Sequence, residues 1–312
     1  MSRLATISPV WGCSVDDLRA LAKIAEDGGF EGIFSPEVPP WSAISNAQVF
    51  AEATSKIKVG TWIANIYMRQ PVMAAATALT IQEISGGRMI LGLGVSHKPV
   101  NDRYEIDMGD PMESMRDFVT AVKSFADGSN PALTLKRELP KLPVYTAGLT
   151  KGAATVAGEV ADGLMPYMAT PEYISTLKGY VADGAKSAGR DPSEIDITNG
   201  IPSFVSDDLD AAIKSAKRGL SGYARFPFYQ RLIRNIGFGD VVDQIQGGAN
   251  PADVFSDELV EAFALVGPAD KCKARLQDFY NAGVDLAIIV PGPVGKQSNV
   301  EVMENTVKAY AG

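Results

Sequence analysis

One motif recurs along this chain and restricts the folds it can adopt: an amphipathic helical stretch ends at a glycine, and a short apolar stretch follows. The motif occurs in LRALAKIAEDGGFEGIFSP, LTIQEISGGRMILGLG, TVAGEVADGLMPY and ARLQDFYNAGVDLAIIVPG. Gly29, Gly87 and Gly283 stand where a left-handed residue ends a helix. Strands that alternate with helices and are apolar on both faces are typical of a parallel sheet. We therefore expect an α/β fold.

Eight stretches qualify as strands: Leu4–Val10, Gly32–Ser35, Ile57–Ala64, Met89–Gly94, Val144–Ala147, Gly163–Tyr167, Ile195–Val205 and Leu286–Pro291. Eight parallel strands with helices between them close into a barrel, whereas an open doubly wound sheet more often has about five to seven strands. The sequence thus predicts a (β/α)8 TIM barrel. No linker-like stretch divides the chain, so we expect a single domain over residues 1–312.

Two stretches are longer than the repeating unit needs. They are Asp127–Leu142, which is rich in proline, and Ser221–Val266, which has the pattern of two additional helices. These insertions follow the fourth and seventh strands, so we expect them on the rim at the carboxyl ends of the strands. There they either cover a ligand, or decorate the barrel or form an oligomer contact.

Charge and residue content restrict the partners. The formal net charge is -8 at pH 7, with two cysteines and one histidine. An acidic chain lacks the field that attracts nucleic acid, and so few Cys and His residues favour neither a metal site nor a disulfide framework. No apolar run approaches the roughly 18 residues of a membrane span, and no signal-peptide pattern opens the chain. We expect a cytoplasmic protein that binds small molecules.

Candidate site residues follow from the strand assignment, because functional side chains of such barrels lie at the carboxyl ends of the strands. The three tryptophans, Trp11, Trp41 and Trp62, all fall at or beside such ends. They either line a pocket for a planar ligand or plug the mouth of the barrel, and we favour the pocket.

The segment YTAGLTKGAATVAGEVADG predicts an anion site after the fifth strand. Gly148 permits a close backbone approach, and Thr150–Gly152 begin a helix whose free N–H groups and dipole attract phosphate. Such a turn is also common without a ligand. After the fourth strand, GLGVSHKPVN fails the GxGxxG pattern of dinucleotide-binding folds, because no third glycine opens a helix.

The block ATSKIKVGTWIANIYMRQPVMAAATALTIQE, followed by SGGRMILGLGVSH, resembles the signature region of the luciferase-like superfamily, in particular its deazaflavin (coenzyme F420)-dependent reductases and dehydrogenases. The similarity extends through AGEVADGLM and more faintly to VGPADKCKARLQDFYNAGVD, so it covers most of the chain. It implies an oxidoreductase with coenzyme F420 or, alternatively, FMN as cofactor. It also implies a homodimer formed through helices near strands two to four.

The resemblance implies where the cofactor lies. Its ring would cross the mouth of the barrel, backed by a bulge in the third strand that contains a non-proline cis peptide in relatives, here Trp62–Ile63. Asn65 would hydrogen-bond the pyrimidine edge of the ring, or serve as a structural amide in a turn. The residues expected to bind the cofactor are Trp62, Ile63, Ala64, Asn65, Ser96, Ala147, Gly148, Leu149 and Thr150.

The residues expected to be catalytic are Glu37, His97 and Trp41, and the first two are candidates for proton transfer. Relatives carry Ser-Asp-His after the second strand, with a tryptophan four residues on, whereas this chain has Ser-Pro-Glu at 35–37 and then Trp41. Glu37 thus replaces the acid–base imidazole and is expected to carry the proton, unless it is a solvated rim residue. His97 follows the fourth strand, where relatives place a polar residue near the reacting edge of the ring.

A hydride is expected to pass between C5 of the deazaflavin and a small organic substrate, in a pocket that includes Trp11, Tyr67 and Tyr229. Tyr229 belongs to a segment rich in tyrosine and arginine, whose charges either meet an acidic cofactor tail or are solvated, and the latter is favoured.

Three other functions stay open at the level of sequence. The first is an FMN-dependent monooxygenase on the same fold. The second is a lyase that uses Lys98 or Lys151 as a Schiff-base amine. The third is a non-catalytic relative that has kept the barrel.

Overall fold

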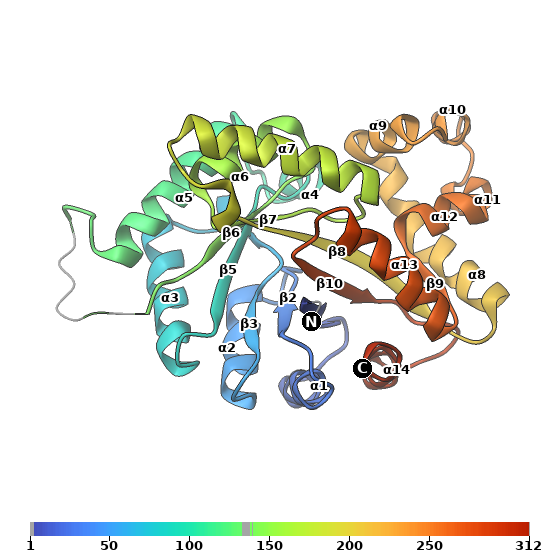
Figure 1. The fold of residues 1–312 in the computed structure, drawn as a ribbon, viewed down its shortest axis with the longest axis horizontal. Helices are drawn as coiled ribbons and strands as arrows, with labels where there is room; N and C mark the ends of the chain where they lie inside the picture. The colour runs from blue at the N-terminus through green and yellow to red at the C-terminus, as the bar shows by residue number, and fades with distance from the viewer. Residues whose placement is uncertain (1–2, 133–137, 139, 312) are drawn as a thin grey trace.

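The computed structural model describes residues 3–132, 138 and 140–311 of the chain. The strands form a parallel barrel, closed because β10 pairs with both β8 and β1, and helices pack around its outside (Figure 1). In order around the barrel, the strands are β1 (Arg3–Ile7), β2 (Gly32–Ser35), β3 (Lys58–Thr61), β5 (Met89–Gly94), β6 (Val144–Ala147), β7 (Gly163–Met165), β8 (Asp196–Val205) and β10 (Leu286–Pro291). The predicted TIM barrel is confirmed.

The strand bounds differ from the prediction in a few places. The predicted third strand is interrupted at Trp62 and Ile63, so that β4 (Ala64–Asn65) forms a separate piece paired with β5. β1 and β7 end earlier than predicted, because Pro9 and Pro166 follow and a proline cannot donate to a strand ladder. A short additional strand, β9 (Leu265–Gly267), pairs with the end of β8.

The helices begin at capping side chains. Ser14 and Ser298 form capping boxes at α1 and α14, and Thr150 accepts a backbone hydrogen bond at the start of α6. None of the described helices is long and apolar enough to cross a membrane. Outside the insertions, the helices are α1 (Val15–Asp27), α2 (Ala43–Ala53), α3 (Pro71–Ile84), α4 (Lys98–Asp102), α5 (Pro111–Asp127), α6 (Lys151–Val160), α7 (Pro171–Ser187), α8 (Leu209–Leu220), α13 (Ala269–Asn281) and α14 (Asn299–Tyr310), with a 3-10 turn η1 (Ile66–Met68) after β4 and η2 (Pro192–Glu194) before β8.

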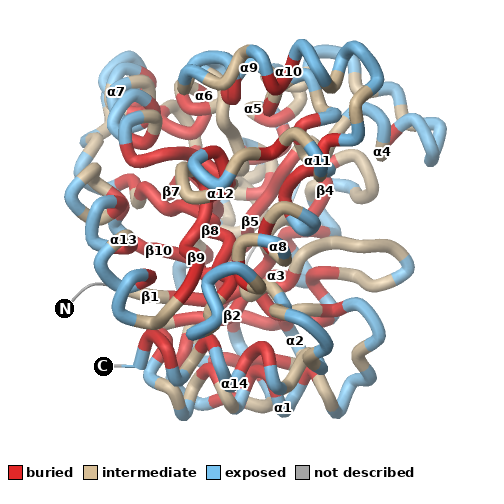
Figure 2. The backbone as a smooth tube through the Cα atoms, turned by 90° about the vertical axis from the view of Figure 1, so that its right-hand side faces the viewer, coloured by how far each residue is buried: buried red, intermediate tan, exposed pale blue. Residues whose placement is uncertain are grey.

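Side chains fill the interior of the barrel. Phe34 is fully buried there, among a cluster that includes Tyr145 and Met165. A Cβ atom on Gly60 would lie 2.2 Å from the carbonyl oxygen of Ile90, so only glycine fits between these strands. Figure 2 shows the strands as a continuous buried core. A ligand can therefore lie only at an open end of the barrel.

The insertion at residues 221–266 lies on the rim, as predicted, since its Tyr223 and Tyr229 line the same cavity as His97, after the carboxyl end of β5. It contains more helices than the two predicted, and together with α8 these build a second hydrophobic core. Since α10 and α11 are short, their periodicity was too brief to be recognised in the sequence. The elements are η3 (Ser221–Arg225), α9 (Pro227–Asn235), α10 (Gly239–Gln246), α11 (Pro251–Val254) and α12 (Asp257–Phe263).

The rim location predicted for Asp127–Leu142 is wrong for its described part. Gln82, near the end of α3, donates a hydrogen bond to the carbonyl of Lys141, and Pro140 lies beside Gly87, just before β5. These residues therefore lie at the amino ends of the strands, because they lead from α5 back to the start of β6. Residues 133–137 and 139 of this insertion lie outside the described residues. The rim segment after β5 is instead residues 95–110, which include α4.

Arg88, in the SGGRM stretch before β5, is a buried cation that joins three elements. Its guanidinium donates to the carbonyls of Ala51 and Thr54 at 3.0 and 2.9 Å, at the end of α2, and to that of Ile57 at 2.7 Å, before β3. It also donates to the carbonyl of Ser85 at 2.7 Å. A cation at this place satisfies the unpaired carbonyls of a helix C-terminus. This arginine therefore has a structural role.

Arg88→Met keeps the length of the side chain but leaves these carbonyls without their donor. We expect the free energy of unfolding to fall by about 3 kcal/mol, because a hydrogen bond to a charged group contributes about 1.5–3 kcal/mol. Denaturant unfolding measures this change. The control is Arg19→Met, which removes an exposed ion pair with Asp16 and should cost less than about 1 kcal/mol. Equal losses in both variants would contradict the anchoring role.

Candidate functional site

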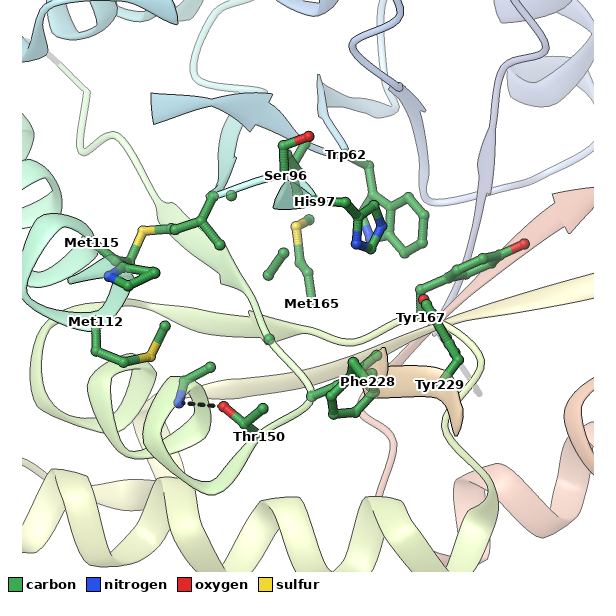
Figure 3. Close-up of a pocket in the computed structure, with 18 of the residues that line it drawn as sticks. Trp62, Ser96, His97, Met112, Met115, Thr150, Met165, Tyr167, Phe228 and Tyr229 are labelled. Atoms are coloured by element: carbon green, nitrogen blue, oxygen red, sulfur yellow. Dashed lines mark hydrogen bonds between the residues drawn. The ribbon is translucent and has the colours of Figure 1, made fainter. Parts of the chain in front are cut away.

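A pocket of about 630 Å³ lies at the carboxyl ends of the barrel strands (Figure 3). Its volume is within the range of about 300–1,000 Å³ typical of small-molecule sites. The ends of β5, β6 and β7 and the interruption between β3 and β4 form its floor, and the rim insertion supplies its cover. The predicted site residues that line it are Glu37, Trp62, Ile63, Ser96, His97, Ala147, Gly148, Leu149, Thr150 and Tyr229.

The structure does not bring five other predicted residues into this pocket: Trp11, Trp41, Ala64, Asn65 and Tyr67. Trp11 is 65% exposed and packs edge to face on Trp41, with ring centroids 5.4 Å apart, so both lie away from the pocket. Ala64 is buried in β4 by strand pairing. The hydroxyl of Tyr67 donates a hydrogen bond to the carbonyl of Met108 at 2.7 Å. Because Met108 lines the pocket, Tyr67 supports the pocket wall without contacting the cavity.

Trp62 and Ile63, at the interruption between β3 and β4, form part of the floor, and we call residues 62–65 the ledge. The Trp62–Ile63 peptide bond is cis, which confirms the position predicted from the resemblance. The Trp62 indole packs edge to face on Tyr167, with centroids 5.3 Å apart. Its Nε1 is buried and has no hydrogen-bond partner among the described residues. This N–H is available to an acceptor atom of a ligand.

His97 lies in the pocket, after a sharp turn at the end of β5 (Figure 3). Ser96 makes this turn with a left-handed φ of 59°. The imidazole of His97 stacks on Phe226 of the insertion, with centroids 4.6 Å apart and planes at 11°. Desolvation by burial lowers the pKa of His97 below its ordinary value of 6.5. The imidazole is therefore neutral at pH 7, with one nitrogen as donor and the other as acceptor.

Aromatic residues form the cover of the pocket. The rings of Tyr167, Tyr223 and Tyr229 pack edge to face, with centroids 5.1 and 5.2 Å apart. Burial raises the pKa of each of these tyrosines, so the hydroxyls stay protonated at neutral pH. The sequence-based prediction placed only Tyr229 in the pocket, and missed Tyr167, Tyr223 and Phe228. The aromatic density of YARFPFY is the signal that would have identified two of them.

Met112 and Met115 form the opposite wall, and Met165 lies between that wall and the aromatic side (Figure 3); the sequence predicted none of the three. Met112 and Met115 come from α5, and Met165 from β7 (Figure 3). Methionine is flexible and polarizable, so such a wall can adapt to the shape of a ligand. No sequence signal separates these residues from core methionines, because a helix face that packs on the barrel has the same spacing.

One end of the pocket is the start of α6. Thr150 lines the pocket and accepts a hydrogen bond from the N–H of Ala153 at 3.1 Å. A Cβ atom on Gly148 would lie 2.4 Å from the Cβ of Ala153, so glycine lets the chain pass close to the first helical turn. The positive end of the helix dipole faces this region, and Arg231 from α9 also lines the pocket. Arg234, by contrast, forms an exposed ion pair with an aspartate of α10.

The two candidate Schiff-base lysines do not line the pocket. The ammonium of Lys98 pairs with Asp102 at 2.7 Å on the exposed rim, and that of Lys151 lies over the ring of Tyr180. A Schiff-base amine must contact its substrate and is activated by desolvation, so this geometry disfavours a lyase. Within the described part of the chain, no group of three or more His, Cys, Asp or Glu residues is arranged to hold a metal ion.

A closed parallel barrel with a pocket at the carboxyl ends of its strands, under a helical cover, is the architecture of a TIM-barrel enzyme. Residues 5–286 match the family model described as luciferase-like monooxygenase. The chain therefore belongs to the luciferase-like monooxygenase family, and the family predicted from the sequence is confirmed.

Three similar proteins illustrate the range of this family. The sequence is 28% identical over 295 residues to 5,10-methylenetetrahydromethanopterin reductase of Methanolobus tindarius. This alignment covers 88% of this chain and 89% of the relative. The fold is similar to that of the coenzyme F420-dependent tetrahydromethanopterin reductase of Methanopyrus kandleri, with a TM-score of 0.81, 22% identity, and 99% and 97% of the two chains covered. It is also similar to the oxygenating constituent of 3,6-diketocamphane monooxygenase from Pseudomonas putida in complex with FMN, with a TM-score of 0.71, 16% identity, and 99% and 98% covered. All three are oxidoreductases, in agreement with the predicted enzyme class.

Because His97 is the only histidine, its imidazole gives one set of signals in an NMR titration. We expect a pKa below 6.5, and we expect Phe226→Ala to raise it towards that value by admitting water. Between the folded and unfolded pKa values the unfolded chain binds more protons, so stability falls as the pH drops through this window. The control is Phe125→Ala, on the distant end of α5. A pKa at or above 6.5 in the unmodified protein would contradict this account.

Proposed function

We propose that this protein is a coenzyme F420-dependent oxidoreductase, in which a hydride passes between C5 of the deazaflavin and a small organic substrate. The observation that carries the proposal is that one pocket combines the ledge with the start of a helix. A planar ring with a phosphate tail needs both features. The reductase names of the Methanolobus and Methanopyrus proteins support this cofactor.

The residues of the pocket fit such a group. The unpaired Nε1–H of Trp62 is a donor for an acceptor on the ring. The first turn of α6 attracts a phosphate, and Arg231, which also lines the pocket, adds a positive charge. When bound, the deazaflavin would supply the hydride chemistry. The chain would orient the ring on the ledge, and its aromatic cover would exclude water.

His97 is the residue that we assign to the proton. Its neutral imidazole can donate to, or accept from, a substrate oxygen or nitrogen at the mouth of the pocket. Stacking on Phe226 fixes the plane of the imidazole. Among the predicted catalytic residues, Trp41 lies outside the pocket, and Glu37 is engaged by other groups of the protein.

An FMN-dependent monooxygenase is the second candidate. The FMN complex of the Pseudomonas protein, which has a similar fold, favours it. The pocket residues themselves do not separate the two cofactors, because both have a tricyclic ring and a phosphate. A deazaflavin reacts poorly with oxygen, so oxygen uptake distinguishes the two functions.

We expect coenzyme F420 to bind to the purified protein at least about tenfold more tightly than FMN, a difference of about 1.4 kcal/mol. Titration with each cofactor, followed by fluorescence quenching, measures both dissociation constants. Arg231→Met is expected to weaken binding of coenzyme F420, whereas the exposed control Arg234→Met is not. Tighter binding of FMN, together with oxygen uptake, would favour the monooxygenase. Binding of neither cofactor would overturn both.

We also propose a homodimer formed through α3. Val72, Met73 and Ile84 are exposed apolar side chains, at 43%, 59% and 43%, and lie on one face of this helix. Ala76 and Thr80 lie between them on the same face. An exposed apolar face of this kind is typical of a contact surface. In a twofold dimer such a face can contact its own copy.

Met73→Glu would place like charges against each other across this contact. We therefore expect the mass measured by light scattering to fall from that of a dimer to 33.1 kDa, the mass of one chain. The matched control is Leu209→Glu, which adds the same charge at an exposed apolar residue on α8. An unmodified protein that is monomeric would contradict the proposal.

A further inference from the structure

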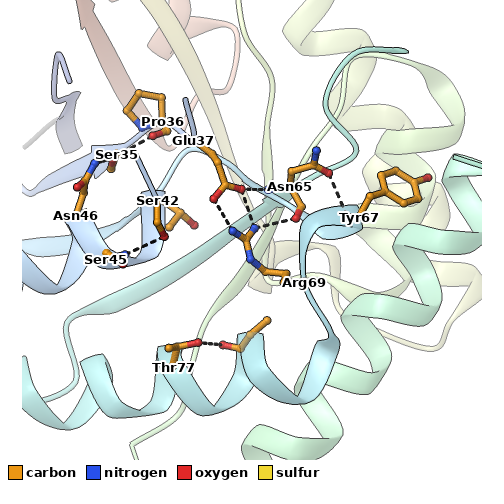
Figure 4. Close-up of polar contacts among 12 residues, drawn as sticks. Ser35, Pro36, Glu37, Ser42, Ser45, Asn46, Asn65, Tyr67, Arg69 and Thr77 are labelled. Carbon is orange, nitrogen blue, oxygen red and sulfur yellow. Dashed lines mark hydrogen bonds and ion pairs between the residues drawn. The ribbon is translucent and has the colours of Figure 1, made fainter. Parts of the chain in front are cut away.

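The resemblance to luciferase-like proteins gave Glu37 the place of an acid–base residue, yet its carboxylate is fully engaged (Figure 4). Oε2 accepts hydrogen bonds from the backbone N–H of Asn65 at 2.6 Å and from Nη1 of Arg69 at 2.8 Å. Oε1 accepts one from Nη2 of the same arginine. The side chains of Glu37 and Arg69 are only 7% and 14% exposed. The two residues thus form a largely buried ion pair with two parallel hydrogen bonds.

We propose that Glu37 and Arg69 are positioning residues, and that Glu37 carries no proton in the reaction. They hold the ledge and the turn at residues 95–97, which we call the His97 turn, in fixed positions relative to each other. The part of this inference that concerns catalysis rests on the proposed function. The part that concerns positioning rests on the contacts alone.

The ion pair clamps the ledge through its last residue, Asn65. Glu37 accepts from the backbone N–H of Asn65, while Nη1 of Arg69 donates to the backbone carbonyl of Asn65 at 2.8 Å. Both backbone groups are thereby held by side chains from outside the ledge. Ile63, two residues earlier, lines the pocket and lies beneath Gly94, where a Cβ atom would be 2.4 Å from Cδ1 of Ile63. Fixing Asn65 therefore fixes the surface on which a ligand rests.

The side chain of Asn65 extends the connection to the His97 turn. Its Nδ2 donates to Oδ1 of Asn101 at 2.8 Å, and Nδ2 of Asn101 donates to the carbonyl of Val95 at 2.8 Å. The backbone N–H of Asn101 donates to the carbonyl of His97 at 3.0 Å. Both asparagines are buried, at 3% and 0% exposure. A buried network with its groups paired is rigid, so the ledge and the His97 turn are coupled.

The same contacts argue against proton transfer by Glu37. Both carboxylate oxygens already accept hydrogen bonds, so a proton on either one would displace a donor from Arg69 or Asn65. It would also weaken the hydrogen bond to Asn65. A group that must gain and lose a proton in each turnover would thus disturb the ledge each time. His97 has no such constraint.

Hydrogen–deuterium exchange of the protein without cofactor tests the positioning role. Glu37→Gln keeps the shape of the side chain and removes its charge. We expect faster exchange in residues 61–67 and, together with it, in residues 95–101, with no change in α13. The control, Asp102→Asn, breaks the exposed ion pair to Lys98 on the same rim and should leave residues 61–67 unchanged. Unchanged exchange in either segment of Glu37→Gln would overturn the coupling.

If Glu37→Gln does not fold, the double variant Glu37→Gln/Arg69→Gln removes both charges and leaves neither unpaired, and the same two segments are compared. Increased exchange in both segments supports the coupling, and a change in one alone overturns it.

The pH profile of the holoenzyme tests the second half of the proposal. A misplaced ledge is expected to lower kcat/KM by about a hundredfold in Glu37→Gln, because small displacements of reacting groups are costly. All limbs of the pH profile should persist in this variant, since Glu37 carries no proton. Loss of one limb would assign proton transfer to Glu37 and overturn this part. If the unmodified protein binds neither cofactor, the proposed function fails, whereas the exchange result still decides the positioning role.

Discussion

The filled interior of the barrel is the constraint on which the site depends. Phe34, Tyr145 and Met165 occupy the space between the strands, and glycines at 60 and 92 are needed to fit them. Since no ligand can enter the barrel, only the loops that leave its strands can form a site. The ledge, the His97 turn and the start of α6 all lie at this edge because each directly follows a strand. Closure of the barrel thus brings together segments that are far apart in the sequence.

The pocket carries less net charge than its number of titratable side chains indicates. The negative charge of Glu37 is balanced by Arg69, and the neutral forms of His97 and the buried tyrosines add no charge. Positive charge at the pocket then comes from Arg231, and the first turn of α6 adds the positive end of its helix dipole. A neutral reacting region next to an anion-binding end suits a ligand that has an uncharged ring and an acidic tail.

The cover and the floor of the pocket have different mechanical characters. The floor is held by strand pairing and by the network from Arg69 to Val95, in which buried polar groups have partners. The cover is made of aromatic rings, most of them from the insertion, and the wall opposite contains the methionines of α5, so both offer a ligand mainly apolar surface. We interpret this as a rigid support for one ligand beneath an adaptable surface for another. Substrate range in such an architecture depends on the cover, whereas alignment depends on the floor.

The sequence by itself determined the barrel, because hydrophobic periodicity and helix-ending glycines are local features. A short motif after the fifth strand located the start of α6. The resemblance located the cis bond at Trp62–Ile63 and the place of His97. Only the tertiary structure decided that Glu37 is paired, because its partner Arg69 is 32 residues away, and that Trp11 and Trp41 lie outside the pocket. It also decided that the described part of Asp127–Leu142 is at the opposite end of the barrel. Segment length and residue type are encoded locally, whereas the contacts of a side chain depend on which distant segments closure of the barrel places beside it.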